Sequence, residues 1–261
     1  MLSYDFMIRA FLASGIVAVV AGLVGYFLVL RAQTFAGHAL SHIAFAGATG
    51  AALIGVAPIY GVLALTVGAG AAMGLLGERL SGRDVTIGII LSLSLGFGVL
   101  FLSLTTTNAT QATALLFGSV LSVSPAMLQT LAVLGVVTLA AIILISRPLV
   151  FSTLQPELAE AKGVSLRLVG TLFLAIVALA VALSIQIVGV LLVFTLMVGP
   201  PAAAQLLTSR LGPGLALSAL LALGQAWLGI TIAFYTDWPT SFWIAILSGA
   251  VYLTAAAIRR R

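Results

Sequence analysis

Apolar stretches of about 18 to 24 residues recur along the whole chain, and few charges interrupt them. Each stretch can cross a hydrocarbon core of about 30 Å as a helix, which satisfies its own backbone hydrogen bonds in lipid. With 62% hydrophobic and 7% charged residues over 261 positions, the chain has too little polar surface for a soluble globule of this size. The sequence therefore predicts an all-α polytopic membrane protein, with residues 1–261 as a single transmembrane domain.

The hydropathy pattern predicts nine crossings, and eight also fit because the boundaries near Pro58 and Gly189 are short. The expected spans are about 7–30, 35–56, 57–77, 85–104, 125–146, 168–187, 190–208, 213–235 and 239–258. Residues 105–124 are expected to form an outer loop and a short half-buried helix. The first stretch is too long for a signal-peptide core, so it is expected to be a retained span.

The basic residues give the orientation of these spans. Ten of the eleven fall in turns that can all be cytoplasmic, as the positive-inside rule requires, and only Arg9 lies on the other side. The amino terminus is then outside and the carboxyl terminus inside. The net charge of +5 is accordingly a membrane-topology signal, and no nucleic-acid partner is expected.

The chain's two histidines, His38 and His42, stand four residues apart near the start of the second apolar stretch. Residues i and i+4 lie on one face of a helix, so the two imidazoles can share one metal ion. The chain has no cysteine, which excludes thiolate metal sites. The alternative is a structural role, with the ring nitrogens bonded to Ser41, Gln33 or a backbone carbonyl. Polar side chains inside a membrane are costly and usually mark a pathway, which favours metal binding.

Three further positions are candidates for a pathway or a gate: Gln186, Pro200 and Asp237. Gln186 lies near the outer end of its span, where an amide can touch an ion or simply face water. Pro200-Pro201 interrupts helical hydrogen bonding and is either a hinge or a static kink. Asp237 is expected at the outer surface, where it caps the last span, which begins at Pro239, attracts a cation or contacts a partner protein. The outer loop adds three weaker polar candidates, Asn108, Gln111 and Ser119.

The longest cytoplasmic segment, about residues 147–167, contains a run that predicts a short amphipathic helix. Proline suits a first helical position, glutamates suit the positive amino end, and glycine suits the exit. The expected helix contains Pro156, Glu157, Leu158, Ala159 and Glu160 and ends at Gly163. Such a helix can dock in the groove of a soluble partner and transmit its motion, although a solvated turn is the alternative.

Several segments, taken in order, carry a resemblance to a known family. The first is Arg31 followed by Gly37-His38-Ala-Leu-Ser-His42, and the later ones are residues 116–124, 156–164, 188–200 and 235–239. In this order and spacing the chain resembles the membrane permeases of the zinc and manganese uptake family of ATP-binding cassette importers. The match covers nearly the whole chain.

The resemblance implies a homodimer of permeases in the bacterial inner (plasma) membrane. It also implies two cytoplasmic cassette ATPases that dock on the 156–163 helix, and an external metal-binding protein that delivers the ion. This chain is not expected to hydrolyse ATP or to hold a resident cofactor, because no Gly-x-x-x-x-Gly loop precedes its only lysine, Lys162. Gln155 stands where the family often has a carboxylate, which weakens a capping contact without removing the helix.

The family often places Asp or Glu where this chain has His38. Imidazole nitrogen suits zinc and copper, whereas oxygen ligands suit manganese and magnesium. The expected substrate is therefore a divalent metal ion, with zinc favoured over manganese. Two imidazoles bind a dication incompletely, so water or a symmetry-related pair would complete a weak site from which the ion can leave.

Other functions stay open from the sequence. An ion-coupled secondary metal transporter normally carries a titratable carboxylate inside the membrane; no predicted span has one at its centre, although the histidines can titrate instead. A permease for a metal chelate would be a longer chain without the paired histidine motif. A passive channel or a membrane scaffold would leave the predicted coupling helix unexplained.

Overall fold

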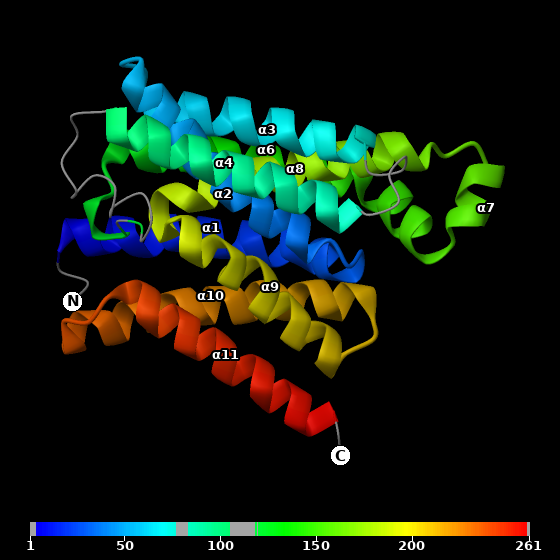
Figure 1. Ribbon diagram of the computed structural model, residues 1–261. Coiled ribbons are helices and arrows are strands. Elements are labelled where there is room, and N and C mark those ends of the chain that lie inside the picture. The colour runs from blue at the N-terminus through cyan, green and yellow to red at the C-terminus, as the bar shows by residue number, and fades with distance from the viewer. Residues whose placement is uncertain (1–3, 77–82, 105–117, 119, 260–261) are drawn as a thin grey trace. The chain divides into compact units, whose positions relative to one another are not determined.

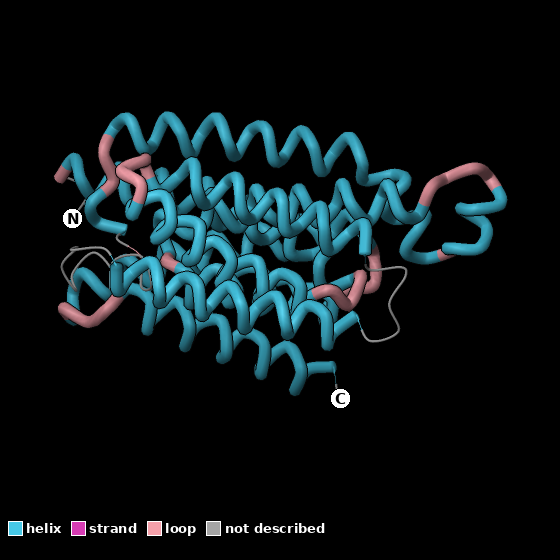
Figure 2. The backbone as a smooth tube through the Cα atoms, turned by 45° about the horizontal axis from the view of Figure 1, so that its top comes forward, coloured by secondary structure: helices cyan, strands magenta, loops and turns pink. Residues whose placement is uncertain are grey.

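The structure is a computed structural model and describes residues 4–76, 83–104, 118 and 120–259. Within these residues it is helical and contains no strand (Figure 1, Figure 2). The elements are α1 (Asp5–Leu30), α2 (Thr34–Leu53), α3 (Pro58–Leu76), α4 (Arg83–Leu104), the 3₁₀ turn η1 (Val120–Ser122), α6 (Pro125–Leu154), α7 (Pro156–Ala161), α8 (Leu166–Val188), α9 (Val190–Leu207), α10 (Leu211–Thr236) and α11 (Thr240–Arg259). The predicted all-α class is confirmed.

Each of the nine predicted spans corresponds to one long helix in the described residues. Seven of these helices are long and apolar enough to cross a membrane, which makes the chain a multi-pass membrane protein. The other two are α2, with 20 residues, and α9, with 18. α2 is the less apolar because it contains both histidines together with Ser41 and Thr49. The predicted outer loop at residues 105–117 lies outside the described residues.

The prediction that the fifth span ends at residue 146 is wrong. α6 continues to Leu154 and contains Pro148 within it. Arg147 followed by proline is typical of a helix end, because proline restricts the residue before it. A proline removes only one helical N–H, however, so the helix can continue beyond it. α9 likewise runs without a break through Pro200 and Pro201.

The chain divides into two compact units, and the first contains residues 1–32, 113–135 and 183–261. In this unit α1 packs antiparallel to α10, as Figure 1 shows. Trp227 Nε1 donates to Phe11 O at 3.1 Å, and Ser218 Oγ donates to Gly22 O at 2.6 Å. α9 packs against α1, α10 and α11. The unit is therefore a bundle of four long helices held by side-chain to backbone hydrogen bonds as well as by packing.

The second unit contains residues 33–112 and 136–182. α2 packs against both α3 and α4 in this unit. Gly47 of α2 and Gly61 of α3 meet so closely that a Cβ on either would collide with the other's carbonyl oxygen. Small residues of this kind allow two membrane helices to approach backbone to backbone. This contact fixes which face of α2 is turned toward α3.

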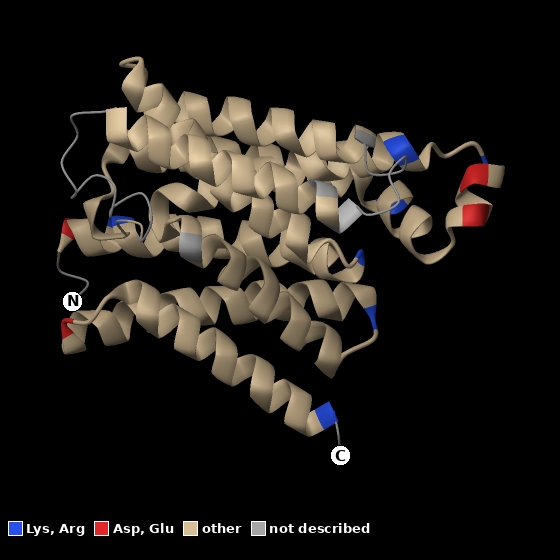
Figure 3. Ribbon diagram, viewed as in Figure 1, with Lys and Arg blue, Asp and Glu red and all other residues tan. Residues whose placement is uncertain are grey.

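In the ribbon of Figure 3 most of the charged residues lie near helix ends or in connecting segments. In the first unit, Arg31 follows α1, Arg210 precedes α10 and Arg259 ends α11. Asp5 and Asp237 stand at the opposite ends of the same helices. This separation agrees with the positive-inside expectation, in which the ends that carry arginine are cytoplasmic.

Candidate functional site

The two histidines lie side by side on α2. Their ring centroids are 4.8 Å apart and the ring planes make an angle of 82°. His38 is in the second turn of the helix and His42 one turn later, and both side chains are half-buried. Two imidazole rings at this separation can direct nitrogen lone pairs toward a common point.

The histidine face of α2 is turned away from α3. Gly47, which meets α3, stands nine residues after His38, and a rotation of about 100° per residue places it on the opposite side of the helix. α4 approaches α2 near Phe45, where a Cβ at Gly98 would lie 2.7 Å from the Phe45 ring. Phe45 stands seven residues after His38, so it lies on nearly the same side of α2 as the histidines. The pair is thus not covered by the α3 contact.

Nearby hydroxyl groups on α2 bond to their own helix. Ser41 Oγ donates to Gly37 O at 3.1 Å, and Thr49 Oγ1 donates to Phe45 O at 3.0 Å. Each of these bonds returns to the preceding turn, which is a common way to bury serine or threonine in a helix. The Ser41 hydroxyl is therefore already used as a donor to the backbone.

No group of three or more His, Cys, Asp or Glu side chains that could hold a metal ion occurs among the residues that the structure describes. The His38–His42 pair supplies two nitrogen ligands, whereas a resident zinc site in a protein normally has four ligands, or three with an open position. The geometry suits an ion that is held briefly better than one that is held permanently.

The short helix α7 has the geometry expected from its sequence. Pro156 occupies the first helical position, and Gln155 makes no side-chain capping bond. Gly163 has a φ of +81°, and it donates its N–H to Glu160 O while Val164 donates to Ala159 O. These two bonds form a Schellman motif, for which glycine is the usual residue at the left-handed position. The end of α7 is therefore sharply defined.

One side of α7 is buried within the second unit and the other is exposed. Ala159 is 0% exposed, whereas Leu158 is 46% exposed. Glu157 and Glu160 are also exposed. An apolar side chain between two carboxylates on a fixed helix is a surface suited to a protein partner.

The remaining predicted positions are distributed along the first unit. Gln186 is half-buried near the end of α8, and Pro200 lies inside the continuous helix α9. Asp237 is the carboxyl-terminal cap of α10, in the left-handed conformation with a φ of 55°. The prediction that it caps the last helix is wrong, because α11 begins only at Thr240. Asn108, Gln111 and Ser119 lie outside the described residues.

The sequence analysis missed one polar residue in the middle of a span, Gln225. Its side chain is 3% exposed, and neither amide atom has a hydrogen-bond partner among the described residues. The signal was available, because a glutamine between Gly224 and Ala226 in an apolar run is unusual inside a membrane.

Comparisons with known proteins cover almost the whole chain. Residues 3–259 match the family described as the ABC 3 transport family. The manganese transport system membrane protein MntC of Halalkalibacterium halodurans is 29% identical over 256 residues, covering 98% of this chain and 88% of the relative. A membrane protein of Treponema pallidum is 32% identical over 265 residues, covering 99% of this chain and 97% of its own length.

Among solved structures, PsaBC from Streptococcus pneumoniae in complex with Fab contains a chain of the same fold. The TM-score is 0.84 with 23% identity, over 97% of this chain and 91% of the solved one. The helical arrangement described above is therefore one that a solved structure also has.

Proposed function

Because the chain belongs to the ABC 3 transport family, as the membrane permease of a metal importer, we propose that it carries a divalent ion past His38 and His42. The observation that supports this role is the position of the two rings, 4.8 Å apart on one face of α2 and half-buried in an otherwise apolar chain. Ionisable side chains are rare inside membranes because they are costly there, and those present usually serve transport.

The two histidines favour zinc as the substrate. Neutral imidazole is a good ligand for zinc, whereas manganese prefers oxygen ligands. The relative MntC is named for manganese transport. In this chain the first position of the pair is His38, a nitrogen ligand. We infer from His38 that the metal preference is shifted from manganese toward zinc.

Two imidazoles leave coordination positions open on the ion. Water or the same pair from a second copy of the chain would fill them, which agrees with a homodimer whose two α2 helices share the path. An incompletely coordinated ion is bound weakly enough to leave, which conduction through a transport path requires.

The energy for transport would come from a separate cassette ATPase. α7 is the surface that suits this partner, since Leu158 is exposed on a helix that Ala159 anchors. Lys162 follows α7 and has no Gly-x-x-x-x-Gly loop before it, so the chain lacks a P-loop there. An external metal-binding protein would deliver the ion to the opposite face.

The test is isotope uptake into proteoliposomes that hold this chain with its ATPase and its binding protein. We expect ATP-dependent zinc uptake that exceeds manganese uptake and is lost in the double variant His38→Ala/His42→Ala, while basal ATPase activity persists. Ser41→Ala is the matched control, because the Ser41 hydroxyl donates to Gly37 O of the same helix. Undiminished uptake in the double variant would remove the histidines from the path, and uptake without ATP would contradict the importer function itself.

A further inference from the structure

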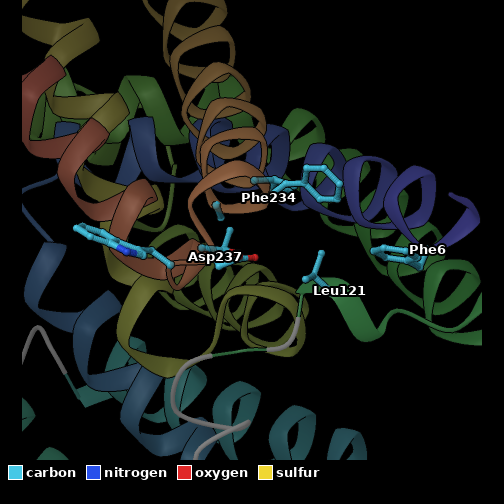
Figure 4. Close-up of a pocket in the computed structure, with 8 residues that line it drawn as sticks. Phe6, Leu121, Phe234 and Asp237 are labelled. Carbon is cyan, nitrogen blue, oxygen red and sulfur yellow. The ribbon is translucent and has the colours of Figure 1, made fainter. Parts of the chain in front are cut away.

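A cavity of about 420 Å³ lies in the first unit, at the end of the helices away from Arg31 and Arg210. Its size is within the range of small-molecule sites, about 300–1,000 Å³. Figure 4 shows side chains from three separate parts of the chain around it. The lining residues are Phe6, Leu121, Ile230, Ala233, Phe234, Asp237, Trp238 and Thr240.

The cavity lies at the level of a membrane surface. α1 begins at Asp5 and α10 ends at Thr236, so the cavity is beside the outer ends of two antiparallel spans. The aromatic side chains around this end are exposed: Tyr235 is 73% and Trp238 is 55% exposed. Exposed Trp and Tyr are typical of the boundary between hydrocarbon and water. The positive-inside rule assigns this end to the outer leaflet, because the opposite ends carry the arginines.

One side of the cavity carries a negative charge without a described partner. Asp237 is held in the left-handed conformation at the end of α10, and its backbone N–H bonds to Ala233 O. Figure 4 shows Asp237 among the side chains that surround the cavity. No hydrogen bond or ion pair joins this carboxylate to another described residue. A carboxylate in this position can accept hydrogen bonds from a cationic N–H donor.

A positive charge lies near the cavity, although it is not part of its lining. Arg9 lies three residues after Phe6, on the same face of α1. Its Nε donates to Val123 O at 3.0 Å, two residues after Leu121, and its side chain is half-buried. This bond uses one of five guanidinium N–H donors. The terminal nitrogens donate to no residue in the described part of the chain, and they remain able to bind a phosphate.

We propose that this cavity binds a zwitterionic phospholipid headgroup with a primary ammonium, of the phosphatidylethanolamine type, from the outer leaflet. The ammonium would donate to Asp237, the phosphate would accept from Arg9, and the start of the acyl chains would lie on Phe6 and Phe234. A quaternary ammonium has no N–H to donate, so a phosphatidylcholine headgroup would lose the contact with Asp237. The proposal does not involve the histidine pair, because none of these residues belongs to α2.

The experiment is native mass spectrometry of the detergent-purified complex of this chain with its ATPase, after equilibration with phosphatidylethanolamine and phosphatidylcholine of identical acyl chains. We expect the wild type to retain phosphatidylethanolamine over phosphatidylcholine by about tenfold, the scale of a charge-assisted hydrogen bond. Asp237→Asn should remove this preference, and Arg9→Gln should lower retention of both lipids. Asp5→Asn is the matched control, because Asp5 is an exposed carboxylate at the same end of α1 that does not line the cavity.

Two results would overturn the proposal. One is an equal preference in wild type and Asp237→Asn, measured on variants that elute from size exclusion like the wild type. The other is loss of association with the external binding protein in lipid-free Asp237→Asn while the lipid preference stays, which would assign the carboxylate to a protein contact. Zinc uptake is a separate readout, so failure here would leave the proposed transport function intact.

Discussion

Ser218 of α10 donates its hydroxyl proton to Gly22 O of α1 at 2.6 Å. A Cβ at Gly22 would lie 2.9 Å from Ser218 O and 3.0 Å from Ala219 Cα, both backbone atoms. The hydrogen bond depends on the absence of a side chain at Gly22, because a larger residue at this position would push apart the atoms that form the bond.

Gly22→Ala is therefore expected to destabilise the first unit by about 1–3 kcal/mol, since backbone atoms cannot move aside as a flexible side chain would. The measurement is the folded fraction after heating in detergent, followed by size exclusion. Gly68→Ala is the control, because a Cβ at Gly68 of α3 would meet nothing within 4 Å. Equal loss in both variants would show that helix glycines here act by flexibility and not by close approach.

Two glutamines of the first unit should respond in opposite directions to the same substitution. Gln205 Nε2 donates to Tyr26 O at 2.8 Å, whereas both amide atoms of Gln225 are buried without a described partner. Gln205→Leu should lower the thermal unfolding temperature because it removes a bond of about 1 kcal/mol. Gln225→Leu should raise it, since it removes a polar group that is costly to bury. A fall in Gln225→Leu would indicate that the amide binds water or an ion in the folded protein.

His38→Asp is expected to change which metal the permease prefers. The substitution exchanges one nitrogen ligand for oxygen, and oxygen ligands favour manganese over zinc. The measurement is the ratio of manganese to zinc uptake in proteoliposomes, which should rise by about tenfold, the factor given by 1.4 kcal/mol. An unchanged ratio would place metal selection in the binding protein.

Leu158→Asp is expected to disconnect ATP hydrolysis from transport. Leu158 is exposed on α7, whose position is held by the buried Ala159. A charge there should weaken an apolar docking contact without disturbing the permease itself. Zinc uptake should fall while ATPase activity of the partner persists. Leu154→Asp is the control, because Leu154 is 64% exposed and precedes α7. Equal loss in the two variants would argue against a specific role for α7.

The spans could be predicted from the sequence because helix length in lipid follows directly from apolar run length. α7 could be predicted for a local reason, since Pro156 and Gly163 suit its two ends whatever surrounds it. The adjacency of His38 and His42 also follows from helical geometry alone.

The failures have both long-range and local causes. The pairing of Ser218 with Gly22 spans 196 residues, and no local pattern indicates its register. Asp237 was misassigned because an aspartate before a helix usually caps that helix, whereas here the turn closes α10. The end of α6 was placed too early because Pro148 costs one hydrogen bond and not the whole helix.

The bond between Arg9 and Val123 can form only after Val123 has been synthesised. Val123 is 114 residues further along the chain, so at about 5–20 residues per second the ribosome reaches it roughly 6 to 23 s after Arg9. During that interval the guanidinium has no acceptor on Val123, and Asp5 is the acidic residue that precedes it within α1. Arg31 at the other end of α1 is made long before Val123, so by the positive-inside rule it can favour a cytoplasmic carboxyl end of this helix before the Arg9 bond forms.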